Sequence, residues 1–298
     1  MIATQTADLF VEHTELKSGI DQWQGTSRQG TAWTVYKGHA RSVLERIADK
    51  SVNCVVTSPP YYWLRDYGSD QQIGLEETVS GYVDSICRVM NEVQRVLKPD
   101  GLLFLNIGDT YYSGKGESQG QDRKSSSRRF GLRAVDKSGG LGIGLRPKTI
   151  IGIPWRVAIA MAQQSWILRS PIIWHREDCL PEQAKDRPSR SYEYVFMFAK
   201  NRKYYFNREA LINQEIEEDM WSIAARPKPT KGIRTAPFPD ELVRRCLTIG
   251  CPDGGFVLDP FAGSGTTLRV AVKSGHPAIG IDVNEKFCDY MVSNLSKL

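Results

Sequence analysis

The chain has 298 residues, of which 41% are hydrophobic and 24% are charged. This composition is ordinary for a globular protein with a sizeable core. No apolar run approaches the roughly 18 residues of a membrane helix, and the first residues lack the basic-then-apolar order of a secretory signal. The six cysteines contain no Cys-x-x-Cys pair, which argues against a zinc site or a disulfide framework.

The net charge is only +5, but it is unevenly distributed. Residues 113–148 hold nine Lys or Arg and three Asp or Glu, a balance of +6, which leaves the rest of the chain near −1. A basic segment of this kind is expected where a protein faces a polyanion. A solvated loop without a ligand explains the charge equally well.

The first half of the chain begins with polar, aperiodic residues 1–30, which we expect to form a flexible arm. A short strand is predicted at 34–37 and a helix at 41–49. Residues 52–57 form a continuous apolar run of strand length, typical of a strand buried on both faces. Apolar residues at helical spacing predict a long helix over 76–97, and a turn at 98–101 leads into a buried strand at 102–107.

The second half begins with an insertion at 113–148 that contains eight Gly and six Ser. Beyond it we expect a helix at 154–164, strands at 166–174 and 193–199, and an irregular stretch at 213–235. The remaining elements are helices at 239–248, 266–274 and 285–296, with strands at 256–258 and 278–281. Alternation of strands and helices predicts one α/β domain over residues 31–298, built on a largely parallel sheet.

A glycine-rich loop follows the strand at 256–258, with the sequence Asp259-Pro260-Phe261-Ala262-Gly263-Ser264-Gly265-Thr266-Thr267. Glycines allow positive φ and close approach to a ligand, and either threonine could cap the following helix. Asp282 ends the next strand, 19 residues after Gly263, where an acid is placed to hold ribose hydroxyls. The loop lacks the lysine of a triphosphate-binding loop, so we expect a nucleoside ligand. An ordinary strand-to-helix turn is the alternative.

A second distinctive turn, Thr57-Ser58-Pro59-Pro60-Tyr61-Tyr62, follows the strand at 52–57 directly. The prolines remove two backbone donors and fix φ, so the turn presents mainly acceptors: the Ser58 oxygen and outward-facing carbonyls. Beside an aromatic ring, such acceptors suit a planar ring that carries an amine. A proline-rich turn with surface tyrosines is the alternative.

Together these two motifs resemble those of the amino-methyltransferases of DNA, and their order resembles the β class, a circular permutation in which the catalytic turn precedes the cofactor loop. The resemblance covers roughly residues 33–296. It extends to further stretches of the sequence: Trp63–Gly68, Arg95–Gly101, Gly108–Tyr111, Ile173–Arg176, Asp186–Pro188, Tyr192–Val195 and Ala236–Val243. It implies a Rossmann-like methyltransferase fold with a mostly parallel seven-stranded sheet, S-adenosylmethionine as cofactor with S-adenosylhomocysteine as product, and no metal.

The resemblance also assigns roles to residues. It implies that the catalytic residues are Ser58, Pro59, Pro60 and Tyr61. The cofactor-binding residues would be Asp259, Phe261, Gly263, Ser264, Gly265, Thr266, Asp282, Pro237 and His39. Two positions depart from the family pattern: His39 stands where an acid usually contacts the adenine of the cofactor, and Arg234 stands where a histidine is usual. Both departures affect the expected detail of cofactor binding and leave the catalytic turn intact.

The implied reaction is direct methyl transfer to the exocyclic amine of a flipped-out base. Serine in the catalytic turn is the usual mark of cytosine N4 enzymes and aspartate of adenine N6 enzymes, so N4 of cytosine is the expected target and N6 of adenine the alternative. No Pro-Cys dipeptide is present, which argues against attack on cytosine C5. An inactive DNA-binding protein of the same fold is a hypothesis of another class, and no RRM, KH or zinc-knuckle pattern favours RNA.

The expected partner is double-stranded DNA, with a cognate restriction enzyme as a further candidate and no membrane. We expect phosphate contacts from Arg123, Lys124, Arg128, Arg129, Lys200, Arg202 and Lys203, and target recognition within 178–232. The expected location is cytoplasmic and nucleoid-associated, or nuclear in a eukaryote. The sequence leaves a monomer and a homodimer equally open.

Overall fold

A computed structural model describes residues 20–62, 72–112, 144–179, 182, 184–213, 215–225 and 237–298. These residues form a nine-stranded sheet of order β1-β2-β9-β8-β3-β4-β6-β5-β7. The strands in chain order are β1 (Asp21–Thr26), β2 (Ala32–Lys37), β3 (Val52–Thr57), β4 (Leu97–Ile107), β5 (Ile167–His175), β6 (Tyr192–Ala199), β7 (Met220–Ser222), β8 (Val257–Asp259) and β9 (Ala278–Asp282).

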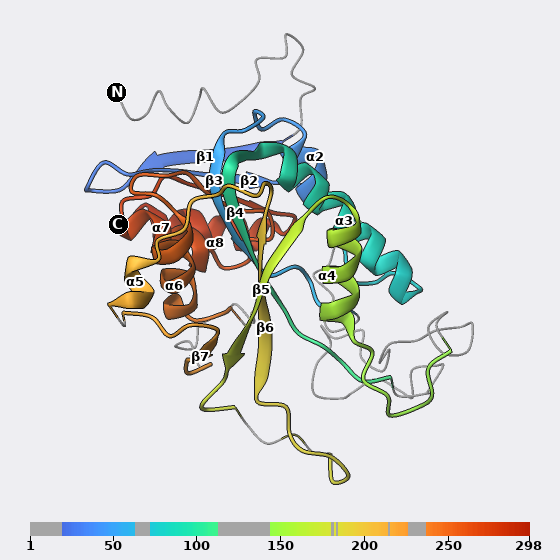
Figure 1. Ribbon diagram of the computed structural model, residues 1–298. Helices are drawn as coiled ribbons and strands as arrows, with labels where there is room; N and C mark the ends of the chain where they lie inside the picture. The colour runs from blue at the N-terminus through green and yellow to red at the C-terminus, as the bar shows by residue number, and fades with distance from the viewer. Residues whose placement is uncertain are drawn as a thin grey trace.

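The helices lie on the two faces of this sheet (Figure 1). They are α2 (Ala40–Leu44), α3 (Val79–Val96), α4 (Ile153–Gln163), α5 (Glu209–Ile212), α6 (Asp240–Gly250), α7 (Thr266–Lys273) and α8 (Glu285–Leu295). Side chains of α2, α3 and α4 share one buried cluster, and those of α6, α7 and α8 share another. The result is a three-layer α/β architecture, as expected. No helix within the described ranges is long and apolar enough to span a bilayer.

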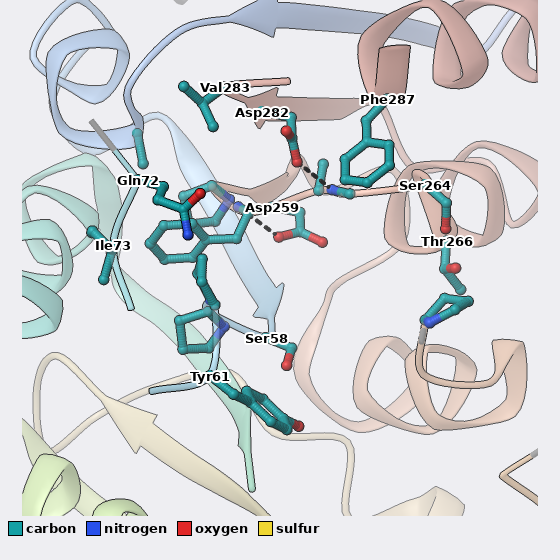
Figure 2. A pocket seen from close by; sticks show the side chains of 18 of the residues that line it. Ser58, Tyr61, Gln72, Ile73, Asp259, Ser264, Thr266, Asp282, Val283 and Phe287 are labelled. Atoms are coloured by element: carbon teal, nitrogen blue, oxygen red, sulfur yellow. Dashed lines mark hydrogen bonds between the residues drawn. The ribbon is translucent and has the colours of Figure 1, made fainter. Parts of the chain in front are cut away.

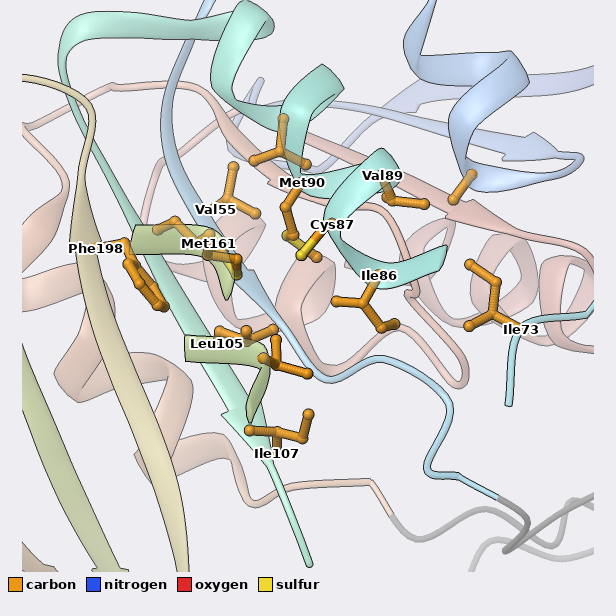
Figure 3. Close-up of a cluster of buried hydrophobic side chains, with 14 of the residues drawn as sticks. Val55, Ile73, Ile86, Cys87, Val89, Met90, Leu105, Ile107, Met161 and Phe198 are labelled. Carbon is orange, nitrogen blue, oxygen red and sulfur yellow. The ribbon is translucent and has the colours of Figure 1, made fainter. Parts of the chain in front are cut away.

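The buried strands explain the continuous apolar runs in the sequence. Along β3, Val55 faces the first cluster while Cys54 and Val56 face the second, and along β4 successive residues alternate in the same way. Figure 3 shows the first cluster, where Val55 and Leu105 lie near the α3 side chains Ile86 and Met90. A strand covered by helices on both faces is apolar at most positions, and not only at alternate ones.

Most of the sheet is parallel, as predicted, but it has two more strands than the seven expected. Its central pairs β2-β9, β9-β8, β8-β3 and β3-β4 are parallel, whereas β6 is antiparallel to both β4 and β5. The extra strands β1 and β7 lie at the two edges. The strand ends form two further sides of the sheet. We call the side at which the parallel strands end the carboxyl edge, and the side at which they begin the amino edge.

The prediction of a flexible arm over residues 1–30 is wrong for its last third. Residues 21–26 form β1, which pairs antiparallel with β2, and residues 1–19 lie outside the described residues. Trp23 packs against the second cluster, and Lys37 Nζ lies 2.9 Å from Asp21 Oδ2. A half-exposed edge strand has no continuous apolar run, so its polar sequence resembles that of a loop.

Of the predicted basic insertion 113–148, residues 113–143 lie outside the described residues. The region 178–232, within which target recognition is predicted, contains β6, close to the strand predicted at 193–199, and the edge strand β7. A target-recognition region within it would therefore have to consist of separate segments around these strands.

Candidate functional site

The glycine loop and the Ser-Pro-Pro-Tyr turn meet because β3 and β8 are neighbouring parallel strands. From β3 the chain crosses over through α3 to β4 on one side, and from β8 it crosses through α7 to β9 on the other. The strand order therefore reverses between β3 and β8. In open α/β sheets such a reversal leaves a crevice at the carboxyl edge, where ligands bind. Motifs about 200 residues apart in sequence thus face one crevice.

The crevice is a pocket lined by residues of both motifs (Figure 2). Predicted site residues in its wall are Ser58, Pro59, Pro60, Tyr61, Asp259, Phe261, Gly263, Ser264, Thr266, Asp282, Pro237 and His39. The wall also contains residues that the sequence did not single out: Gly38, Ala40, Gln72, Ile73, Phe238, Ala262, Val283 and Phe287. Several of these lie directly beside a predicted residue, and their nearness in sequence is the signal that could have found them.

The glycine loop is shaped by two left-handed residues, Gly263 (φ +52°) and Gly265 (φ +79°). A Cβ added to Gly263 would meet no atom within 4 Å, so the backbone there borders open space. A Cβ added to Gly265 would lie 2.5 Å from Met291 Cγ of α8. Gly265 therefore packs the loop closely against α8, and its role in cofactor contact stays a prediction.

Asp259 joins the two motifs through its buried carboxylate. It accepts hydrogen bonds from the Thr57 and Thr267 hydroxyls, each at 2.6 Å, and from the Phe261 N–H at 3.0 Å. Burial raises its pKa to about 6, although these bonds act in the opposite direction. The expectation that a threonine side chain caps α7 is wrong: Gly265 is the N-cap, and Thr267 bonds to Asp259 instead.

Asp282, the acid predicted to hold ribose hydroxyls, lies across the pocket from the catalytic turn (Figure 2). Its Oδ2 accepts from the Gly263 N–H at 2.9 Å and its Oδ1 from the Asn284 N–H at 2.8 Å. Burial raises its pKa to about 6. The carboxylate therefore fixes the glycine loop to the end of β9, and its unused lone pairs are available to hydroxyl donors.

His39 lies in the pocket wall, at the start of α2. Burial and the neighbouring Arg41 lower its pKa, so the imidazole is neutral at neutral pH. A neutral imidazole has one N–H donor and one acceptor nitrogen, whereas a carboxylate has acceptors only. The other departure, Arg234, lies outside the described residues.

The catalytic turn is held in place by hydroxyl donors. The Tyr82 hydroxyl of α3 donates to the Pro60 carbonyl at 2.8 Å. The Tyr61 hydroxyl donates to Glu193 Oε2 at 2.6 Å, and Asn106 Oδ1 lies 3.3 Å from the same hydroxyl. Burial and the Glu193 carboxylate raise the pKa of Tyr61 well above its ordinary value, so the phenol stays protonated.

Three of the predicted phosphate-binding residues lie far from this pocket. Lys200, Arg202 and Lys203 follow β6 at the amino edge, because β6 runs antiparallel to β4. Lys200 Nζ donates to the Leu97 carbonyl at 2.9 Å. The structure therefore does not bring these residues together with the catalytic turn. The other four, Arg123, Lys124, Arg128 and Arg129, lie outside the described residues. Within the described ranges, no group of three or more His, Cys, Asp or Glu is arranged to hold a metal ion.

Comparisons with known proteins agree on one family. Residues 52–293 match the family model described as DNA methylase. The chain is 40% identical over 268 residues to the type II methyltransferase M.Cfr9I of Citrobacter freundii, covering 88% of this chain and 87% of that one. It is 39% identical over 258 residues to the type II methyltransferase M.SmaI of Serratia marcescens, covering 84% and 86%.

Solved structures share the architecture. PvuII DNA methyltransferase (cytosine-N4-specific) matches with a TM-score of 0.68 over 89% of this chain and 86% of that one, at 19% identity, a likeness of fold alone. The putative DNA modification methylase TTHA0409 of Thermus thermophilus, complexed with S-adenosyl-L-methionine, matches with a TM-score of 0.59 at 25% identity, over 87% and 92% of the two chains. The pocket thus lies in a fold that is shared with nucleic-acid-modifying proteins.

Proposed function

Because the chain belongs to the DNA methylase family, as a β-class amino-methyltransferase, we propose that it transfers a methyl group from S-adenosylmethionine to N4 of cytosine at a specific site in double-stranded DNA. One observation carries the proposal. The Ser-Pro-Pro-Tyr turn and the glycine loop line opposite sides of one pocket at the point where the strand order reverses. A pocket of this composition provides a place for an amine-bearing ring beside a place for a nucleoside.

The residues on the glycine-loop side fit the cofactor. The open space beside Gly263 accepts a ligand against the backbone, and Asp282 offers a carboxylate to ribose hydroxyls. Phe261, Val283 and Phe287 provide apolar and aromatic surface for a purine. When bound, S-adenosylmethionine supplies an activated methyl group on a sulfonium sulfur. His39, Pro237, Ser264 and Thr266 complete the proposed cofactor site, with no metal.

The residues of the turn act on the base. An exocyclic amine is a poor nucleophile because its lone pair is delocalised into the ring. Acceptors at Ser58 Oγ and the Pro59 carbonyl would draw its N–H groups out of the ring plane and free the lone pair. The proposed carbonyl acceptor is that of Pro59, as the family resemblance implies, while the neighbouring Pro60 carbonyl accepts from the Tyr82 hydroxyl. Positioning of this kind lowers a barrier by several kcal/mol, and stacking on Tyr61 would contribute about 1–3 kcal/mol.

The choice of N4 of cytosine over N6 of adenine rests on Ser58. In the family that the sequence resembles, serine at this position is usual in cytosine N4 enzymes and aspartate in adenine N6 enzymes. We further propose that target recognition lies in segments of 178–232 other than β6, β7 and the amino-edge residues that follow β6. A restriction enzyme of the same specificity would accompany this protein, as the type II names of its relatives imply for them.

The deciding experiment supplies S-adenosylmethionine labelled on its methyl group together with unmethylated genomic DNA, then digests the DNA and identifies the labelled nucleoside. N4-methylcytosine is the expected product. N6-methyladenine would overturn the choice of base, and DNA binding without any label transfer would favour a non-catalytic binding protein. Labelled RNA in a parallel reaction would redirect the proposal to another substrate.

The proposed DNA contacts have their own test, the dependence of affinity on salt. Each phosphate contact contributes a slope of about −0.9 in log K against log salt. Replacing Arg123, Lys124, Arg128 and Arg129 with alanine should therefore flatten the slope by up to about 3.6 units if all four touch phosphate. Replacing Arg202 and Lys203 at the amino edge is the matched control. A flattened slope in the control alone would show that DNA binds at the amino edge of the sheet.

A further inference from the structure

Glu193 stands out beside the catalytic turn as a shielded carboxylate with several donors. It lies near the start of β6, which the antiparallel register brings to the carboxyl edge next to the end of β4. Its side chain is only 14% exposed. Its Oε2 accepts from the Tyr61 hydroxyl at 2.6 Å and from Asn106 Nδ2 at 3.3 Å, while its Oε1 accepts from Arg176 Nη1 at 3.3 Å.

These contacts hold the carboxylate in place and set an opposite charge beside it. A carboxylate that is largely withdrawn from water is costly unless donors and an opposite charge surround it. Arg176 supplies that charge and is itself held, because its Nη2 donates to the Arg190 carbonyl at 2.7 Å. Asn106 is held in turn by its bond to the Tyr194 carbonyl at 3.2 Å. Both oxygens of Glu193 therefore have fixed directions.

The Tyr61 ring is restrained at two points. A Cβ added to Gly108 would lie 2.7 Å from Tyr61 Cε2, so the ring packs directly against the backbone that follows β4. At the far end of the ring, the hydroxyl is bonded to Glu193. Backbone contact alone limits translation of the ring, whereas the bond to the hydroxyl also fixes its tilt. The remaining freedom of the side chain is then small.

Resting on the proposed function, we propose that Glu193 is a positioning residue, which holds the Tyr61 ring at the angle that stacks the target base beside Ser58. Glu193 acts through the phenol and not on the base itself. Hydrogen bonds to charged groups are among the stronger ones in proteins. The β4–β6 half of the sheet thereby sets the geometry of a turn that leaves β3.

The test compares Glu193→Ala and Glu193→Gln with wild type in single-turnover methyl transfer to unmethylated genomic DNA. The alanine variant removes the acceptor, and its transfer rate should fall by about tenfold to a hundredfold, the effect of losing a charge-assisted bond. The glutamine variant keeps an acceptor oxygen for the phenol and should recover part of that loss. Cofactor affinity and KM for DNA should change by less than about twofold, because neither ligand is expected to touch Glu193.

A double-mutant cycle with Tyr61→Phe separates positioning from general destabilisation. Without the phenol, Glu193 has no hydrogen bond to the Tyr61 ring, so Glu193→Gln should have less than about a twofold further effect on the rate in that background. The matched control is Glu92→Gln in α3, a partly shielded carboxylate paired with Arg95 at 2.8 Å, remote from the pocket. It should transfer methyl at the wild-type rate.

The outcomes distinguish the two proposals. An inactive wild-type protein would contradict the proposed function itself. An active wild type with Glu193→Ala transferring at the rate of the Glu92→Gln control would overturn the positioning role alone, as would additive effects of Glu193→Gln and Tyr61→Phe. Loss of cofactor affinity in Glu193→Ala to the same degree as the loss of rate would also overturn it, because that result indicates a general structural defect.

Discussion

The glycine loop and the Ser-Pro-Pro-Tyr turn line the same pocket but are held by different means. The glycine loop is fixed by two acids at the ends of β8 and β9, the buried Asp259 and the partly buried Asp282, which accept from the loop's own backbone N–H groups. The turn has few backbone donors, and phenol hydroxyls anchor it instead: Tyr82 of α3 donates to the Pro60 carbonyl, and the turn's own Tyr61 donates to Glu193 on β6. The glycine loop is thus held by the ends of β8 and β9, which flank it, whereas the turn is held by residues of α3 and β6.

This difference implies that cofactor affinity and transfer rate can be changed separately. Among the described carboxylates, Asp259 alone bonds to both motifs. It accepts from the Thr57 hydroxyl at the end of β3 and from the Phe261 N–H of the glycine loop. Other changes to the loop should reduce cofactor affinity, while changes to the anchors of the turn should reduce the rate and spare affinity. Separate measurements of cofactor affinity and transfer rate on single variants test this expectation.

The largest effect is expected from Gly263→Val. A β-branched residue at φ +52° is strained, and its side chain would project into space that the proposed ligand needs. Cofactor affinity measured by calorimetry should fall by more than about a hundredfold, a loss of about 2.7 kcal/mol or more. The matched control is Gly254→Val, also at positive φ (+67°) and also with no atom near its added Cβ, which should bind normally. Equal losses in the two variants would assign the effect to backbone strain.

Ser58→Ala should give the next largest effect, on rate alone. Removal of the acceptor for the amine should slow single-turnover methyl transfer by about tenfold or more. Cofactor affinity should stay within about twofold, since the glycine loop keeps all of its bonds. Ser296→Ala at the C-cap of α8, which loses an exposed bond to the Val292 carbonyl, serves as the control. Undiminished transfer by Ser58→Ala would remove the serine from the reaction.

Low pH should weaken cofactor binding through Asp282. Its pKa lies at about 6 in the folded protein, and its protonation removes an acceptor for hydroxyl donors. The dissociation constant should therefore rise below pH 6, by at most about tenfold per pH unit for one proton. Asp282→Asn should flatten this dependence across a calorimetric series from pH 5 to pH 8, and a wild-type constant that does not change over the series would contradict the role.

Protonation of Asp282 should stabilise the folded protein, although it should weaken cofactor binding. A folded-state pKa of about 6 against an ordinary value of 3.8 means that the folded protein binds the proton more tightly. The contribution of Asp282 to the free energy of unfolding should therefore be full below about pH 4 and decline as pH rises to about 6. Urea unfolding of wild type and Asp282→Asn at pH 4.5 and pH 7 measures this contribution by difference.

The smallest effect is expected from Tyr82→Phe, which removes one bond to the turn and leaves the ring. The loss should cost about 0.5–1.5 kcal/mol of stability and slow transfer only a few-fold, with cofactor affinity unchanged. Tyr204→Phe, whose hydroxyl accepts an exposed bond from Arg169 at 2.7 Å, is the control for loss of a phenol bond far from the pocket. A fall in cofactor affinity in Tyr82→Phe would show that the turn and the glycine loop are energetically coupled.

The elements that the sequence predicted well are those with a single local explanation. Residues 52–57 are mostly apolar because helices cover both faces of the sheet, and they form β3 with the predicted bounds. The apolar spacing over 76–97 corresponds to α3, which begins where the Thr78 hydroxyl accepts from the Gly81 N–H at 3.0 Å. Edge strands β1 and β7 were missed because short, half-exposed strands carry little periodicity.

The chemistry of the pocket can be read from residue types along the chain: an acceptor-rich turn in Ser58–Tyr61, a backbone exposed at Gly263 and an acid at Asp282. The first two features depend on residues within a few positions of one another. The partners that all three meet follow from the arrangement of the whole sheet. The antiparallel course of β6 brings Glu193 to Tyr61 and carries Lys200 to the opposite edge, and the curvature of the loop turns Gly265 toward Met291. Strand order and direction are set by packing over the whole sheet, so no local pattern encodes them.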